Sequence, residues 1–82
     1  MEAKSKVAIC KLVKDIYNKE VIPFDGSATS FRTMSTAYAK IATLFDSFKA
    51  THEDVLVYLG IDLYTWYFEE YDEISNIFLV DK

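Results

Sequence analysis

Hydrophobic residues recur along this chain at steps of three and four, which is the period of one face of an α-helix. In residues 3–21 the apolar side chains fall on one face and lysines fall on the other. Residues 30–48 carry the most regular pattern, which consists of Phe31, Met34, Tyr38, Ile41, Phe45 and Phe48. The pattern therefore predicts two long helices.

A loop is predicted between these two helices. Residues 22–27 hold the only proline of the chain and one of its two glycines. Proline disfavours a helical conformation in the residue before it, and glycine favours turns. We expect Ser27, Thr29 or Ser30 to cap the helix that follows, because short hydroxyl side chains can accept its first backbone N–H groups.

The last third of the chain predicts a short helix followed by a long one over residues 63–79. Thr51 is expected to cap the short helix, and the carboxylate of Asp54 is expected to complete a capping box and to complement the helix dipole. Gly60 can take the left-handed conformation that ends this helix, and Asp62 is expected to cap the next one.

A β-hairpin over residues 55–68 is the alternative for this region, because strand-forming residues lie on both sides of a glycine. The helical interpretation is preferred because residues suited to capping stand where the two helices need them. The sequence thus predicts an all-α fold, a compact four-helix single domain over residues 1–82 with three longer helices and one short one.

Length and composition agree with a single folded domain. A chain of 82 residues buries only about 60% of its unfolded surface, which leaves room for one core. The hydrophobic fraction of 51% is far above that of disordered chains. No run approaches the roughly 20 apolar residues of a membrane span, the start is rich in lysine, and the single cysteine excludes an internal disulfide. A cytoplasmic location is therefore expected.

Charge is unevenly distributed along the sequence, and the net charge is −4. Residues 1–41 hold seven basic and four acidic side chains, whereas residues 42–82 hold two basic and nine acidic ones. Such asymmetry bears on partners and association rather than on the fold. The outer face of the first helix is expected to be basic through Lys4, Lys11, Lys14 and Lys19.

The final helix has more apolar surface than one core needs. Tyr64 and Phe68 widen its apolar arc to about twice the usual width of roughly 100°. The opposite face carries Glu69, Asp72 and Glu73. Glu70 is predicted near the middle of the apolar arc, where a carboxylate needs a partner or a route to water.

Residues that could carry catalysis have simpler interpretations. His52, the only histidine, is expected to be a solvated residue in a first helical turn, and Cys10 a small core side chain. The acidic run at residues 69–73 lacks the alternating ligands and glycine turn of a calcium loop. Phosphate loops, nucleophile elbows and zinc-protease motifs are absent from the sequence. We therefore predict that the chain is not an enzyme and uses neither a cofactor nor a metal ion.

Residues Thr51 to Phe68 resemble the helix-turn-helix of small bacterial and phage regulators. The resemblance lies in a capped short helix, a glycine at the tight turn, apolar residues at Val55, Leu59 and Ile61, and Trp66 in the second helix, where a core residue is expected. It implies that the second helix enters the major groove of DNA. The positions that match the base-reading ones hold Leu63, Tyr64, Thr65 and Phe68 and are followed by two glutamates, which depart from the family pattern because DNA phosphates would be repelled. If the geometry is present, we expect it to serve protein binding.

The leading hypothesis is a small interaction or inhibitor protein of the kind that phages and other mobile elements encode. Its acidic and aromatic C-terminal helix would bind a basic surface, such as that of a nucleic-acid-binding protein, and would imitate nucleic acid. The residues expected to bind are Tyr64, Phe68, Glu69, Asp72 and Glu73. Two alternatives are a DNA-binding regulator that uses the basic face of the first helix, and a self-associating protein in which that face meets the acidic helix of another copy.

Overall fold

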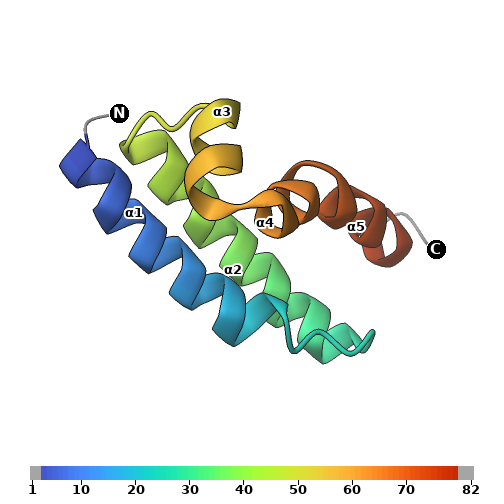
Figure 1. The fold of residues 1–82 in the computed structure, drawn as a ribbon. Coiled ribbons are helices and arrows are strands. Elements are labelled where there is room, and N and C mark those ends of the chain that lie inside the picture. The colour runs from blue at the N-terminus through green and yellow to red at the C-terminus, as the bar shows by residue number, and fades with distance from the viewer. Residues whose placement is uncertain (1–2, 80–82) are drawn as a thin grey trace.

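Two antiparallel helices form the base of the structure. The computed structural model describes residues 3–79. Helix α1 (Ala3–Ile16) continues into a π-helical turn, η1 (Tyr17–Val21), and a loop leads back into α2 (Ala28–Ser47), which lies beside α1 (Figure 1). The molecule is elongated along this pair, with extents of 44 × 20 × 20 Å.

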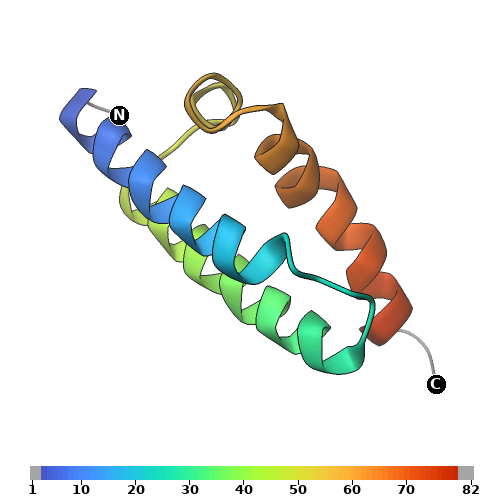
Figure 2. The same ribbon diagram turned by 60° about the horizontal axis from the view of Figure 1, so that its bottom comes forward.

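A short helix crosses one end of this pair, and a longer one returns along it. The short helix consists of α3 (His52–Asp54) and the π-helical turn η2 (Val55–Leu59). After Gly60 the chain forms α4 (Ile61–Thr65), η3 (Trp66–Glu70) and α5 (Tyr71–Leu79), which follow one another without a break. We call this continuous segment, Ile61–Leu79, the acidic helix. It runs back toward the loop between α1 and α2 (Figure 2).

This arrangement confirms the predicted all-α fold with three longer helices and one short one. Residues 3–79 contain no strand. The hairpin alternative over residues 55–68 is wrong, because the chain is helical on both sides of Gly60. The short helix of this segment begins with a side-chain cap at Thr51, although the composition of the segment also suits strands.

Large rings on α2 and the acidic helix hold these two elements together. The ring of Tyr38 stacks on Tyr71 with centroids 3.9 Å apart and on Tyr67 at 4.5 Å. Near the other end, Phe31 stacks on Phe78 at 4.5 Å. The hydrophobic core beneath these rings consists of Ile9, Val13, Val21, Phe31, Met34, Ala37, Ile41, Phe45, Val55, Leu59, Leu63 and Trp66.

Caps begin two of the helices as the sequence predicts. Ser27 caps α2, and its hydroxyl accepts the backbone N–H of Ser30 at 3.1 Å. Thr51 and Asp54 form a reciprocal capping box, in which each side chain accepts the backbone N–H of the other residue, at 3.1 and 2.9 Å. These bonds satisfy backbone donors that the first helical turn leaves without partners.

The predicted cap at Asp62 is wrong. The helix begins one residue earlier, at Ile61, and its N-cap is Gly60, which has no side chain to bond. Gly60 has φ 95° and ψ 164°, so its φ is positive as expected, but its ψ is extended rather than left-handed helical. Asp62 therefore lies inside the first turn, where its negative charge interacts favourably with the helix dipole but its side chain does not cap the helix.

Glu70 lies beside apolar residues as predicted, and its exposure gives the carboxylate the route to water that this place requires. In η3 the backbone N–H of Tyr71 bonds the carbonyl of Trp66, five residues back, so this turn holds one residue more than an α-helical turn. Tyr71, at the end of this turn, packs against Tyr38 of α2. A constant step of 100° per residue does not describe such a turn.

Candidate functional site

The acidic helix exposes a set of carboxylates, which we call the acidic face. No lysine, arginine or histidine occurs between Ile61 and Leu79. Among residues 3–79 the ion pairs join Lys6 to Asp54 and Lys40 to Glu20, so none of them neutralises this helix. The members of the acidic face, all exposed, are Asp62, Glu69, Glu70, Asp72 and Glu73.

The two rings predicted to bind a partner, Tyr64 and Phe68, are only half-buried but have neighbours within the chain. Phe68 stacks on His52 with centroids 4.1 Å apart and lies 4.8 Å from Tyr64. His52 itself is exposed at the start of the short helix, as expected. These rings therefore form the border of the acidic face rather than an open aromatic surface.

The basic face of α1 is exposed as predicted. Lys4, Lys11, Lys14 and Lys19 are all exposed. None of them takes part in the two ion pairs found within the described part of the chain. The protein thus presents two surfaces of opposite charge, one on α1 and η1 and one on the acidic helix.

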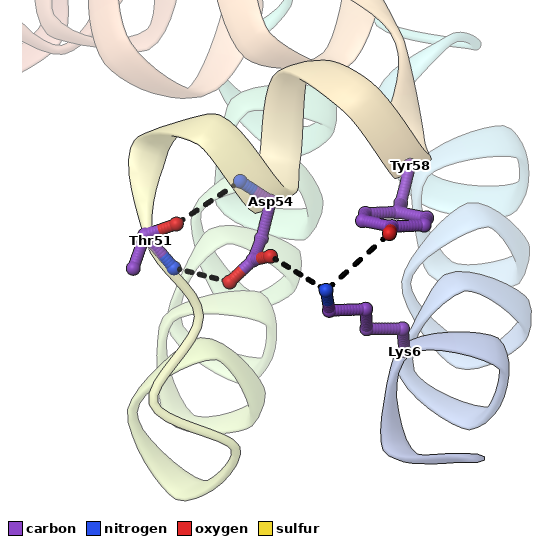
Figure 3. A network of polar contacts seen from close by, with 4 residues as sticks. All are labelled: Lys6, Thr51, Asp54 and Tyr58. Atoms are coloured by element: carbon purple, nitrogen blue, oxygen red, sulfur yellow. Dashed lines mark hydrogen bonds and ion pairs between the residues drawn. The ribbon is translucent and has the colours of Figure 1, made fainter. Parts of the chain in front are cut away.

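A polar network joins the start of α1 to the short helix (Figure 3). The ammonium group of Lys6 lies 3.7 Å from a carboxylate oxygen of Asp54 and donates a hydrogen bond of 3.3 Å to the hydroxyl of Tyr58. The bond to Tyr58 and the charge of Asp54 raise the pKa of Lys6 above its ordinary value. The backbone N–H of Thr51 lowers the pKa of Asp54 and thereby keeps it ionised.

The sequence indicated only half of this network. The pair of Thr51 and Asp54 followed from capping chemistry, but Lys6 and Tyr58 are 52 residues apart and no local pattern relates them. Cys10 adds a third contact, because its thiol donates to the backbone carbonyl of Tyr58 at 2.8 Å. Cys10 is half-buried beside the core, close to its predicted role as a small packing residue. The network positions the short helix and, through Gly60, the start of the acidic helix.

Exposed apolar side chains gather around Gly60, and their exposure was not predicted from the sequence. Val57 and Ile61 are 63% and 60% exposed, and Leu56 and Tyr58 are also exposed. A signal for them exists in the sequence, because they lie off the positions at which Val55 and Leu59 enter the core. They extend the exposed surface next to the beginning of the acidic helix.

A groove lies between the end of α1 and the acidic helix, with a volume of about 330 Å³. We call it the Tyr17–Trp66 groove; its lining residues are Tyr17, Val21, Ile22, Phe24, Met34, Trp66, Glu70 and Ile74. Tyr17 and Trp66 meet edge to face with centroids 5.5 Å apart. Burial raises the pKa of Tyr17, and the negative charges of Asp62 and Glu70 raise it further. The groove is therefore aromatic, apolar and under negative potential.

Trp66 is in the core, as predicted, and is 3% exposed. Its indole N–H is buried and has no hydrogen-bond partner within residues 3–79. Buried donors without acceptors are rare in proteins and cost free energy. This donor is the one unsatisfied buried side-chain polar atom found in the described part of the chain.

The positions that correspond to the reading residues of a helix-turn-helix are largely covered. Leu63 is 2% exposed, and Tyr64, Thr65 and Phe68 are half-buried. Side chains that read base edges must reach into the major groove of DNA. The residues that adjoin these positions in the sequence, Asp62 and Glu69, are exposed and acidic.

Two other properties concern ligands and membranes. Within residues 3–79, no three side chains of histidine, cysteine, aspartate or glutamate lie close enough together to hold a metal ion. The helices of the same residues include none with the length and apolar character needed to cross a membrane.

Comparison with known proteins adds no relative. No family model matches the chain, and no curated protein or solved structure matches it either.

Proposed function

We propose that this chain is a non-enzymatic interaction or inhibitor protein that binds a basic protein surface through its acidic face. The observation that carries the proposal is the set of exposed carboxylates on one helix that has no cation of its own. A partner with lysine and arginine side chains would supply the missing positive charge. A row of carboxylates along a helix also resembles the phosphates of nucleic acid, so a nucleic-acid-binding protein is a suitable partner.

The energetic argument rests on like charges within the helix. Glu69 and Glu73 are four residues apart, and Glu69 and Asp72 are three apart, as are Glu70 and Glu73. Each such pair destabilises a helix by about 0.2–0.5 kcal/mol. Aromatic packing against α2 holds the helix in place despite this repulsion. A basic partner would relieve the repulsion, and its charges would be steered to the face before contact.

The border of the acidic face supplies apolar contact. The rings of Tyr64 and Phe68 are fixed by each other and by His52, so a partner would meet them with little loss of side-chain freedom. Fixed aromatic rings are common among the residues that contribute most to protein interfaces. Glu69, Asp72 and Glu73 would select the partner by charge.

Two variants with equal net charge test the proposal. One is E69Q/D72N/E73Q, which neutralises part of the acidic face. The control is D15N/D46N/E53Q, which removes the same number of exposed carboxylates elsewhere. Each chain is immobilised, and the proteins it captures from the cells that express it are quantified at low and high ionic strength.

We expect the first variant to lose a basic partner that the wild type and the control retain. The captured protein is then purified, and its association constant should fall about tenfold for the face variant, since three exposed ion pairs contribute 0.2–1 kcal/mol each. Higher salt should weaken wild-type binding. Capture of the same proteins in equal amounts by all three chains would contradict the proposal, provided that circular dichroism shows them equally helical.

A DNA-binding regulator is the second candidate, because four lysines of α1 and η1 are exposed without ion pairs. Phosphate contacts by these lysines would give duplex binding that weakens as salt rises. Lys11→Glu should then weaken the binding seen as a mobility shift at low salt. The covered reading positions and the acidic residues beside them favour the first candidate.

Self-association is the third candidate, since the basic face of one copy could meet the acidic face of another. The two faces are exposed on the same chain. Light scattering at two ionic strengths tests it, because an assembly held by these charges should dissociate as salt rises.

A further inference from the structure

The Tyr17–Trp66 groove differs from the other hollows of the surface in its charge. Three larger hollows each contain a cation among their lining residues, namely Arg32, Lys49 and Lys19. The Tyr17–Trp66 groove contains no cation, and Glu70 is its one residue that is charged at neutral pH. An occupant that carries a positive charge is therefore favoured here and opposed by none of the lining residues.

The walls of the groove suit a cation on an apolar stem. Tyr17 and Phe24, which are both half-buried, present aromatic surface on which a planar guanidinium group can stack. Ile22, which is 60% exposed, and Ile74 offer contact to the methylene groups of such a side chain. The volume of about 330 Å³ is at the small end of ligand sites, which suits one side chain better than a large ligand.

Trp66 also lines the groove, and its buried indole N–H has no acceptor in the described part of the chain. Burial is the largest cause of the raised pKa of Tyr17, and Asp62 and Glu70 add to it; their negative charge has the sign that attracts a cation.

We propose that the Tyr17–Trp66 groove is a subsite that takes one arginine side chain of a basic partner, with Glu70 pairing with its guanidinium group. This inference rests on the proposed function and specifies one contact within it. Glu70 and Glu73 are three residues apart on the acidic helix, so an arginine in the groove places the rest of the partner against the acidic face. Arginine is preferred to lysine because its planar group both stacks on rings and bonds carboxylates in pairs.

The test is a titration of the full ¹⁵N-labelled chain with N-acetyl-arginine amide, followed by NMR. Trp66 is the only tryptophan, so its indole N–H gives a single signal that reports on the groove. N-acetyl-citrulline amide, which has a similar shape but no charge, is the ligand control. Glu70→Gln removes the carboxylate of the groove, and Glu53→Gln is the matched protein control, since Glu53 is exposed, does not line the groove and lies outside the acidic face.

We expect a saturable shift of the Trp66 indole signal with the arginine compound and a weaker response to citrulline. The affinity should fall about two- to fivefold in Glu70→Gln, as for the loss of one exposed ion pair, and stay unchanged in Glu53→Gln. A signal that does not move, an equal response to both ligands, or unchanged affinity in Glu70→Gln would overturn the inference.

The result can be separated from that of the proposed function. E69Q/D72N/E73Q leaves Glu70 in place, so loss of the partner by that variant, together with no arginine binding in the titration, supports the acidic face and rejects the groove. Arginine binding that depends on Glu70, together with unchanged capture by E69Q/D72N/E73Q, supports the groove as an arginine site and rejects the acidic face as the partner surface.

Discussion

Replacement of Tyr71 tests whether aromatic packing holds the acidic helix to α2. The ring of Tyr71 stacks on Tyr38 at 3.9 Å and lies 6.0 Å from Trp66. Its hydroxyl shares a hydrogen bond of 2.8 Å with the hydroxyl of Ser35 on α2. Tyr71 thus links the π-helical turn of the acidic helix to the middle of α2 by two kinds of interaction.

The expected magnitudes follow from these contacts. Tyr71→Phe removes only the hydroxyl and should lower the free energy of unfolding by about 1 kcal/mol. Tyr71→Ala also removes the ring. A fully buried aromatic ring contributes about 3–5 kcal/mol, and because Tyr71 is half-buried we expect a total loss of about 3 kcal/mol. A domain of this size has a free energy of unfolding of roughly 4–12 kcal/mol, so the midpoint of thermal unfolding should fall by roughly 15 °C.

Urea unfolding followed by circular dichroism and by the fluorescence of Trp66 measures these changes. Ile77→Ala is the control, because Ile77 lies on the same helix, is 67% exposed, and gains a similar helix propensity on replacement by alanine. Its free energy of unfolding should change by no more than about 0.5 kcal/mol. A loss below about 1 kcal/mol in Tyr71→Ala, or one equal to that in Ile77→Ala, would refute the view that these rings attach the helix.

Three further predictions concern the backbone and the loop. Lys49, which follows the end of α2, has φ 54°. Lys49→Gly should raise the free energy of unfolding by about 0.5–1 kcal/mol in the same urea assay, because glycine adopts this conformation without strain. Gly60→Ala should lower the free energy of unfolding by about 1–3 kcal/mol, because an alanine at this positive φ is strained. The added methyl group meets no atom within 4 Å, so steric contact contributes nothing, and a neutral result would show that the positive φ of Gly60 is not required. Bonds from Ser30 and Ser27 lower the pKa of Asp25 from 3.8 to about 2. Since the folded pKa is the lower one, the stabilisation by Asp25 is present above pH 3.8 and is lost as the pH falls toward 2. Asp25→Asn should therefore lose less stability across this window than the wild type, and identical acid profiles would contradict this.

The local interactions of the chain could be predicted from the sequence. The stripe from Phe31 to Phe48 defined α2, and the capping box of Thr51 and Asp54 defined the start of the short helix, because both depend on residues within a turn or two of each other. The exposed acidic and basic side chains were likewise predictable, since charged groups avoid burial without partners.

Tertiary structure alone decided where the additional aromatic rings of the last helix pack. Sequence spacing showed more apolar rings than one face holds, but not that Tyr38 of α2 would stack on both Tyr67 and Tyr71. The π-helical turn that ends at Tyr71 is a further feature that the sequence did not predict, and Glu70 of this turn lines the Tyr17–Trp66 groove. The contact of Lys6 with Asp54 and Tyr58 arises in the same way. Such features depend on packing between segments that are distant in sequence. Caps and helical faces depend on residues close together along the chain, and only these local interactions can be predicted from the spacing of residue types in the sequence.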